Sequence, residues 1–226
     1  MSVMALRSRD EMLKNVKAVL FDLDGTLIDS MWIWKEIDLM YLGKRGLSMP
    51  DDLQKRIEGM SMRETATFFK DTFGIEDSPE AMMDEWIAMA FETYATRVEY
   101  KKGAEDFLRY LRTRGIKTGI CTSNARELLQ VIADKLHMEA YIDCFLTANE
   151  VERGKPFPDS YLEVARRLQV DPSQCLVFED IIPGILAGQA AGMRVCAVYD
   201  AYSADVTEQK QALADHYIED YTNIVR

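Results

Sequence analysis

The stretch V-K-A-V-L-F-D-L-D-G-T-L-I-D-S, residues 16–30, decides the fold of this chain. An apolar run of strand character ends abruptly at two carboxylates, Asp22 and Asp24, and Gly25 follows at once. Such a run is typical of a strand that is buried on both faces of a parallel sheet. Because an unpaired buried charge is costly, we expect both carboxylates at the carboxyl end of this strand, where open α/β sheets bind ligands.

The two carboxylates favour a site for a divalent cation. If the backbone stays extended beyond the strand, side chains two residues apart point the same way, so Asp22 and Asp24 would converge on one small volume. Their repulsion is relieved best by a divalent cation with oxygen ligands, and Gly25 permits the sharp turn that follows. The letters D-x-D-G also occur at ordinary strand-to-turn junctions, so the rest of the chain has to decide.

The composition is that of an acidic globular protein. Its 226 residues are 48% hydrophobic and 29% charged, and 27 basic against 38 acidic residues give a net charge of −11. No stretch collects Lys and Arg into a basic face, which argues against nucleic acid and anionic membranes as partners. No segment approaches the roughly 18 apolar residues of a membrane helix, and the first residues do not resemble a signal peptide.

The cysteines indicate the compartment. Each falls inside an apolar run and none forms a C-x-x-C pair; they are Cys121, Cys144, Cys175 and Cys196. Buried free thiols in a reducing compartment are therefore expected rather than disulfides or a zinc site. We expect a cytoplasmic protein that is a monomer or a weak dimer.

From residue 30 to about residue 100 the pattern is helical. Apolar residues recur at three- and four-residue steps, Gly and Pro lie only at the joints, and no β-like alternation is present. This predicts a helical domain over residues 30–100, inserted into a core domain made of residues 1–29 and 101–226. The many Met residues of the insert either fill its core, which we favour, or form an adaptable contact face. Residues 1–14 are expected to be a short helix or a frayed tail.

From Lys101 onward, strand-like and helix-like segments alternate. Helices are expected near residues 104–114, 126–136, 160–168, 181–192 and 207–214. Strands are expected over I-K-T-G-I-C, D-C-F-L-T, C-L-V-F and R-V-C-A-V-Y. Such alternation implies an α/β fold with a doubly wound, Rossmann-like parallel sheet.

Polar side chains follow several of these strands at the edge where this fold binds ligands. They are Asp22 and Asp24, Thr122 and Ser123, Lys155 in a loop, and Glu179 and Asp180. Each type has a use in phosphoryl transfer, where positioning and charge neutralisation do most of the work. One carboxylate can attack phosphorus, and a second can protonate the leaving oxygen and later deprotonate water. Magnesium on acidic residues, a hydroxyl and a lysine can offset and hold the phosphoryl charge.

Four segments in order resemble the motifs of the haloacid dehalogenase superfamily: F-D-L-D-G-T, C-T-S-N, G-K-P-F-P-D and F-E-D-I-I-P-G-I-L-A-G. The helical insert after the first segment resembles the α-helical cap of the β-phosphoglucomutase and phosphoglycolate phosphatase branch. The likeness covers residues 16–200, and four ordered motifs with a cap in the right gap form a specific signal.

The resemblance implies roles for the acidic residues. Asp22 would be the nucleophile that becomes phosphorylated. Asp24 would be the general acid and base, and it would lend its backbone carbonyl to a Mg²⁺ ion. Asp180 would be a further metal-side ligand, and Glu179 would act on the metal directly or through water.

The resemblance also implies a phosphate-binding set. Thr122 would supply the phosphate-binding hydroxyl, with Ser123 and Asn124 adjoining it, although Ser123 could take the hydroxyl role instead. Lys155 would link the nucleophile and the phosphate. Arg63 resembles the place where relatives contact the distal part of the substrate, and the alternative is a solvated arginine at a helix start.

The function implied is a Mg²⁺-dependent phosphatase that acts on a small phosphorylated metabolite such as a sugar phosphate. Family members that cleave carbon–halogen bonds or phosphonates lack the second aspartate, so Asp24 points to phosphate esters. The alternative is a phosphosugar mutase. However, β-phosphoglucomutases of this branch resemble one another in carrying a cap histidine twelve positions after the nucleophile, where this chain has Trp34. His137 and His216 lie outside every motif, so hydrolysis is favoured.

The two tryptophans at the start of the helical insert have two possible roles. Trp32 and Trp34 lie where the chain enters the cap, and they either form a wall of the pocket or, as we favour, fill the cap core.

A receiver-like signalling module is a competing class of protein, because it would share the acidic cluster, the hydroxyl and the lysine. Such modules have no reason to carry a helical insert that closes over the site, so the insert favours an enzyme.

Overall fold

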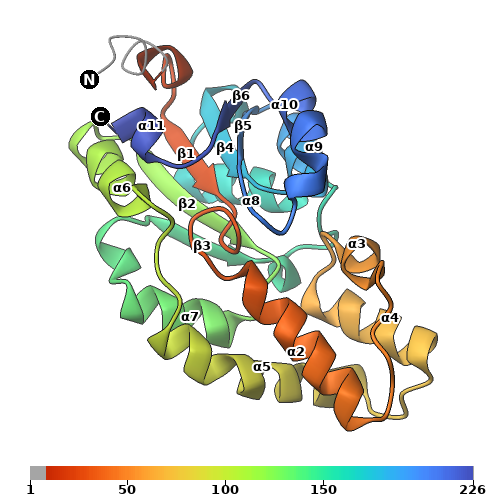
Figure 1. Ribbon diagram of the computed structural model, residues 1–226. Coiled ribbons are helices and arrows are strands. Elements are labelled where there is room, and N and C mark those ends of the chain that lie inside the picture. Colours follow the sequence, from red (N-terminus) through yellow and green to blue (C-terminus); the bar gives the residue numbers. More distant parts are fainter. Residues whose placement is uncertain (1–8, 226) are drawn as a thin grey trace.

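A six-stranded parallel sheet forms the core of the fold (Figure 1). The structure is a computed structural model that describes residues 9–225. The strand order is β3-β2-β1-β4-β5-β6. The strands are β1 (Ala18–Phe21), β2 (Lys117–Thr122), β3 (Cys144–Thr147), β4 (Cys175–Glu179), β5 (Arg194–Val198) and β6 (His216–Ile218). The predicted α/β class with a doubly wound sheet is confirmed.

Helices cover both faces of the sheet because β1 sends alternate side chains to opposite sides. Val19 and Phe21 enter the apolar layer under α6 (Ala104–Thr113), α7 (Arg126–Lys135) and α11 (Thr222–Val225). Ala18 and Leu20 enter the layer under α8 (Asp159–Leu168) and α9 (Ile182–Ala190). Each of these strand residues has no exposed surface, which explains why the run is apolar without interruption.

Four consecutive helices lie between β1 and α6, beside the end of β1 (Figure 1). They are α2 (Met31–Lys44), α3 (Leu53–Ile57), α4 (Met62–Phe73) and α5 (Pro79–Thr96). Local signals set their ends. Ser61 and Glu64 form a capping box at the start of α4, and Gly74 ends that helix with a φ of 65°. All four helices fall within residues 30–100, and the division into core and cap domains stays a prediction.

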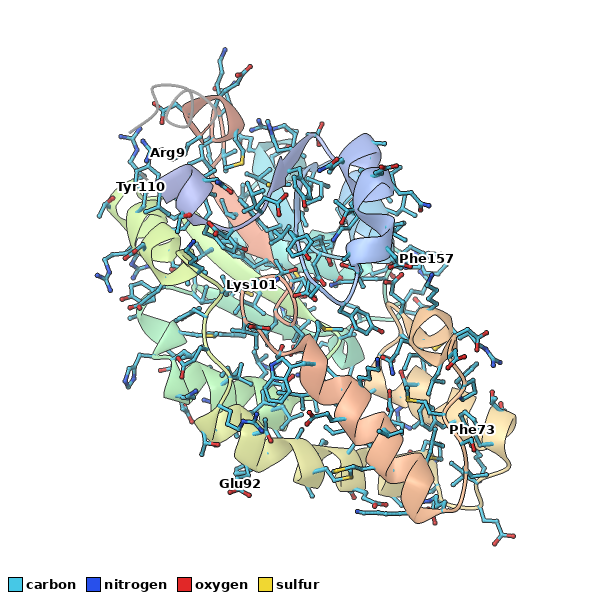
Figure 2. All side chains as sticks on the ribbon, viewed as in Figure 1. Arg9, Phe73, Glu92, Lys101, Tyr110 and Phe157 are labelled. Atoms are coloured by element: carbon cyan, nitrogen blue, oxygen red, sulfur yellow. The ribbon has the colours of Figure 1, made fainter. Side chains whose placement is uncertain are left out.

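The segment that returns from α5 to the core is anchored by a buried ion pair. Lys101, labelled in Figure 2, donates from Nζ to Asp200 Oδ2 at 2.7 Å and to the Tyr199 carbonyl at 2.6 Å. Both acceptors lie directly after β5. The cap is therefore tied at its exit to the loop that follows a central strand.

The C-terminal part holds elements beyond those predicted. The expected helix is α10 (Thr207–Leu213), and the structure adds β6 and α11 after it. A strand of three residues is too short to show an alternation in the sequence. One-turn 3-10 helices connect other elements: Met138–Ala140, Ala148–Glu150, Pro172–Gln174 and Ala204–Val206.

Three smaller expectations can be compared with the structure. Residues 9–12 are helical, and the rest of the expected leader up to residue 8 lies outside the described residues. All four cysteine thiols are free. Within residues 9–225, no helix combines the length and the apolar character needed to cross a bilayer.

Candidate active site

A cavity of about 150 Å³ lies between the carboxyl ends of the central strands and the cap helices. Residues from the first, second, third and fourth motif segments line it together: Asp22, Asp24, Thr122, Ser123, Asn124, Lys155 and Asp180. Parallel pairing of β1 with β2 and β4 brings these strand ends to one edge. The structure therefore gathers at one place side chains that are up to 158 residues apart in the chain, from Asp22 to Asp180.

Asp22 and Lys155 form a buried ion pair. Lys155 Nζ lies 2.5 Å from Asp22 Oδ1 and also contacts Glu179 Oε1. Burial would lower the pKa of Lys155, but the charges of Asp22 and Glu179 outweigh it and raise this pKa above its ordinary value. Burial raises the pKa of Asp22, and Lys155 opposes that rise. The lysine stays charged and helps to keep the Asp22 carboxylate ionised.

A cluster of carboxylates adjoins this pair. Asp22, Glu179 and Asp180 each place an oxygen within 4.8 Å of the others, and all three are buried. Tyr161 Oη donates to Glu179 Oε1 at 2.7 Å, and Thr26 Oγ1 donates to Asp180 Oδ1 at 2.8 Å. Burial, followed by the charge of Glu179, raises the pKa of Asp180 to about 7. Lys155 is the one described lysine in an ion pair with this cluster, and buried Lys210 Nζ donates to the Asp180 backbone carbonyl at 2.8 Å. The three carboxylates themselves outnumber their paired lysine, which favours a further cation.

The cluster fits a divalent cation. Asp180 Oδ2 is buried and has no hydrogen-bond partner within the described residues, although such oxygens are normally paired. A Cβ on Gly25, whose φ is +83°, would collide with this same oxygen. The absence of a side chain at Gly25 therefore leaves space beside Asp180 Oδ2. A carboxylate oxygen of this kind is a ligand that Mg²⁺ prefers. The Asp24 side chain is not part of this cluster.

Asp24 faces the same cavity but is held by neutral donors. Ser30 Oγ donates to its Oδ1 at 2.6 Å, Tyr94 Oη also donates to Oδ1, and Asn124 Nδ2 donates to Oδ2 at 3.0 Å. Burial raises the pKa of Asp24, and these hydrogen bonds oppose the rise. A carboxyl group with a raised pKa and a fixed orientation is suited to give and take a proton.

Thr122 and Ser123 both offer a hydroxyl group to the cavity. Thr122 Oγ1 accepts the Asn124 backbone N–H at 3.0 Å, which leaves its own proton free for another acceptor. Ser123 is more exposed than Thr122, and both residues line the cavity. Both hydroxyls can therefore reach a bound anion.

Arg63 is not brought into this cavity. It lines a neighbouring hollow and pairs through Nη1 with Glu80 Oε1 at 2.6 Å on the cap surface. Trp34 lines the cavity and lies edge-on to the Tyr94 ring, with the centroids 6.0 Å apart. Trp32 is outside the cavity lining and donates from its indole N–H to the Asp29 carbonyl at 3.2 Å. Only one of the two tryptophans at the cap entrance therefore forms a wall.

Sequence reasoning missed several residues that shape the site. Tyr94 of α5 and Ser30 orient Asp24, and Tyr161 of α8 orients Glu179. Ser30 lies at the end of the first motif stretch, where a polar residue before a helix is typical of a cap and gives no functional signal. The two tyrosines occupy ordinary apolar positions of amphipathic helices, so nothing in the pattern separates them from core residues.

The model of the haloacid dehalogenase-like hydrolase family matches residues 16–192. The chain is 32% identical over 183 residues to a bifunctional riboflavin kinase/FMN phosphatase from Arabidopsis thaliana; the match covers 80% of this chain and 48% of that protein, about half its length. It is 30% identical over 179 residues to a phosphorylated carbohydrates phosphatase from Thermotoga maritima, and the match covers 79% of this chain and 82% of that protein.

A solved structure gives the same result for the fold. A putative beta-phosphoglucomutase from Thermotoga maritima is 26% identical and superposes with a TM-score of 0.71, covering 92% of this chain and 97% of that one. The predicted enzyme class, a phosphoric monoester hydrolase, is confirmed at the level of the family and its named relatives. The chain belongs to the haloacid dehalogenase-like hydrolase family.

Proposed function

We propose that the chain is a Mg²⁺-dependent phosphatase that hydrolyses a small phosphorylated metabolite, such as a sugar phosphate, through a phosphoaspartate on Asp22. The observation that carries the proposal is the placement of the Asp22 carboxylate. It lies in one cavity with Lys155, with a carboxylate cluster that has an unpartnered oxygen, and with a second, separately held aspartate. The phosphatases among its relatives support the same reaction.

In the first step, a carboxylate oxygen of Asp22 attacks phosphorus and the bond from phosphorus to the leaving oxygen breaks. Asp24, whose pKa burial raises, donates its proton to that oxygen, so the leaving group departs as a neutral alcohol. The hydrogen bonds from Tyr94 and Asn124 orient Asp24 during this transfer. The product is an acyl phosphate on Asp22.

In the second step, water attacks the phosphorus of this acyl phosphate. Asp24, now ionised, takes a proton from the water, and the bond between phosphorus and the Asp22 oxygen breaks. Inorganic phosphate leaves and both aspartates return to their starting states. Lys155 and the hydroxyl of Thr122 or Ser123 hold the phosphoryl oxygens throughout.

Asp22, Asp180 and the Asp24 carbonyl, with Glu179 directly or through water, would hold Mg²⁺, which when bound would offset the repulsion between the anionic nucleophile and the anionic phosphate. The cap, residues 30–100, would close the cavity over the substrate. The cytoplasmic location and the monomeric or weakly dimeric state stay predictions.

Hydrolysis is proposed ahead of a mutase reaction. A mutase must keep water from its phosphoenzyme, and the β-phosphoglucomutases of this branch resemble one another in carrying a cap histidine twelve positions after the nucleophile. The cavity lining within the described residues has Trp34 and no imidazole. His137 is exposed, and His216 lies in the edge strand β6.

The test is release of inorganic phosphate from a panel of phosphorylated metabolites, with Mg²⁺ and with chelator, by the native chain and by Asp22→Asn. We expect metal-dependent release that Asp22→Asn abolishes, because an amide cannot form the acyl phosphate. Isomerisation of a sugar phosphate without release would support the mutase. Undiminished turnover by Asp22→Asn would contradict the proposal.

A further inference from the structure

The cap side of the cavity is acidic and has no cation of its own. Asp38 of α2 and Glu58, directly after α3, line it. Among the described lining residues the cationic side chain is Lys155, and its charge is taken up by Asp22 and Glu179. Any group of a substrate that reaches the cap therefore meets two carboxylates that no lysine or arginine of the lining neutralises.

Asp38 is held in one orientation. Gln54 Nε2 donates to Asp38 Oδ2 at 2.7 Å, and Tyr202 Oη donates to Gln54 Oε1 at 2.8 Å. The second donor fixes which end of the amide faces the carboxylate. Three residues from α2, α3 and the loop after β5 thus form one chain of hydrogen bonds across the cap and the core.

The other oxygen of Asp38 is open. Oδ1 accepts no hydrogen bond within the described residues, although Asp38 is only 6% exposed. A carboxylate this deeply buried normally has a cation or a full set of donors, because its desolvation is costly. Because Asp38 lines the cavity, its open oxygen is suited to accept a hydrogen bond from a bound molecule.

The remaining walls are apolar and aromatic. Trp34 and Trp86 line the cavity with Met60, and Met31, Ile57 and Met62 complete this surface. Such walls pack against the carbon skeleton of a ligand, while a few placed polar groups fix its orientation. Glu58 is half-buried, and its side chain makes no hydrogen bond or ion pair within residues 9–225.

We propose, on the basis of the proposed function, that Asp38 and Glu58 select phosphomonoesters by the charge of the leaving group. The preferred leaving group carries hydroxyl or ammonium donors for the Asp38 carboxylate. It carries no second phosphate or carboxylate, because such a group would be placed beside two carboxylates that no lysine or arginine of the described cavity lining pairs with. The substrate class is thus a neutral or amino-bearing sugar or polyol monophosphate, and bisphosphates and phosphorylated acids are excluded.

The experiment compares substrates that are matched in size and differ in charge. Glucose 6-phosphate is paired with 6-phosphogluconate, glycerol 3-phosphate is paired with 3-phosphoglycerate, and glucosamine 6-phosphate tests the ammonium group. The reference is p-nitrophenyl phosphate, whose leaving group has neither a hydroxyl or ammonium donor for Asp38 nor a second anionic group. We expect kcat/KM to favour at least one neutral or amino-bearing member over its carboxylate counterpart by about tenfold or more.

Two variants separate the Asp38 carboxylate from general effects on the cap. Asp38→Asn should narrow that preference several-fold, mainly through KM. The matched control is Asp84→Asn, an exposed position of the same cap, which should leave the preference unchanged. Glu58→Gln should narrow the preference in the same direction, which keeps the test informative if Asp38→Asn does not fold.

The outcomes distinguish the two proposals. If p-nitrophenyl phosphate is hydrolysed but no neutral or amino-bearing member exceeds its carboxylate counterpart, the charge selection is wrong and the phosphatase stands. The charge selection by these two residues is also wrong, and the phosphatase stands, if the preference exists and neither Asp38→Asn nor Glu58→Gln changes it. If no phosphate ester is hydrolysed at all, the phosphatase proposal fails, and the selection fails with it.

Discussion

A single buried carboxylate, Asp38, carries an energetic cost that the fold itself does not require. Burial raises its pKa to about 6, and the hydrogen bond from Gln54 only partly opposes the rise. The pKa of an aspartate in an unfolded chain is about 3.9. The folded state therefore binds this proton more tightly than the unfolded state does, so stability falls as the pH rises through about 6.

Asp38→Asn should therefore stabilise the protein at neutral pH. The expected gain in the free energy of unfolding is about 2–3 kcal/mol at pH 8. It should disappear below about pH 4, where Asp38 of the native chain is protonated in both the folded and the unfolded state. Thermal unfolding of both proteins as a function of pH measures it, with Asp84→Asn as the exposed control. A variant that is less stable than the native chain at every pH would mean that the carboxylate supports the fold.

At the same scale, the sequence is sufficient to predict which motif residues lie close together. Asp22, Lys155 and Asp180 were predicted to meet, and they lie around one cavity, because each follows or neighbours a parallel strand whose end is fixed by the sheet. Asp38 and Tyr94 were not predicted. Their positions depend on how the cap helices pack on the core, and an acidic residue or a tyrosine on an amphipathic helix carries no sign of that packing.

Among the elements, α3 is short and makes direct contacts with the core. Gln54 accepts a hydrogen bond from Tyr202, and Lys55 Nζ lies 2.5 Å from Asp205 Oδ2. Tyr202 comes from the loop after β5, and Asp205 comes from the 3-10 helix Ala204–Val206 that follows this loop. The first contact lies in the cavity lining, whereas the second is an exposed ion pair with 72% and 53% of the two side chains exposed.

Tyr202→Phe should weaken substrate binding more than chemistry. Loss of the hydroxyl frees the Gln54 amide to rotate and removes the fixed orientation of Asp38, while Asp22 and Asp24 are untouched. We expect KM for a preferred sugar phosphate to rise by about three- to tenfold with kcat nearly unchanged, which corresponds to roughly 1 kcal/mol. Lys55→Met is the control, because exposed ion pairs contribute little. A lower kcat at constant KM would place Tyr202 in the chemical step instead.

The element pattern was predictable for a physical reason. Strands buried on both faces and amphipathic helices impose different apolar spacings, and these spacings located β1, β2, β4 and β5 and the helices around them. The edge strand β6 has three residues, and the apolar spacing of so short a segment is not informative. The separation of Arg63 from the cavity was also not predictable, since it depends on the packing of α4 beside α5, where Arg63 pairs with Glu80.

On the scale of the whole molecule, the fold holds three carboxylates together in a buried space, and Lys155 is the described lysine that forms ion pairs with them. This arrangement is stable only to the extent that the excess negative charge is neutralised or protonated. A cation that binds the folded chain and not the unfolded one raises stability by mass action. Metal binding and thermal stability should therefore be coupled.

Saturating Mg²⁺ should raise the melting temperature of the native protein by about 5–10 °C at one hundred times the dissociation constant, and chelator should reverse the change. Asp180→Asn should lose most of this increase because it removes the open oxygen. Asp84→Asn should retain it. A native protein whose melting temperature does not respond to Mg²⁺ would show that the cluster is neutralised by protons alone.

The most direct test of the central claim is to trap the phosphoenzyme in Asp24→Asn. With p-nitrophenyl phosphate the leaving group departs without a general acid, so Asp22 can still be phosphorylated. The second step then lacks its general base and becomes slow. Mass spectrometry of the acid-quenched variant should find one added phosphoryl group on the peptide that contains Asp22. Turnover by the native chain together with no phosphoryl group on this peptide, or with one on another residue, would contradict the account.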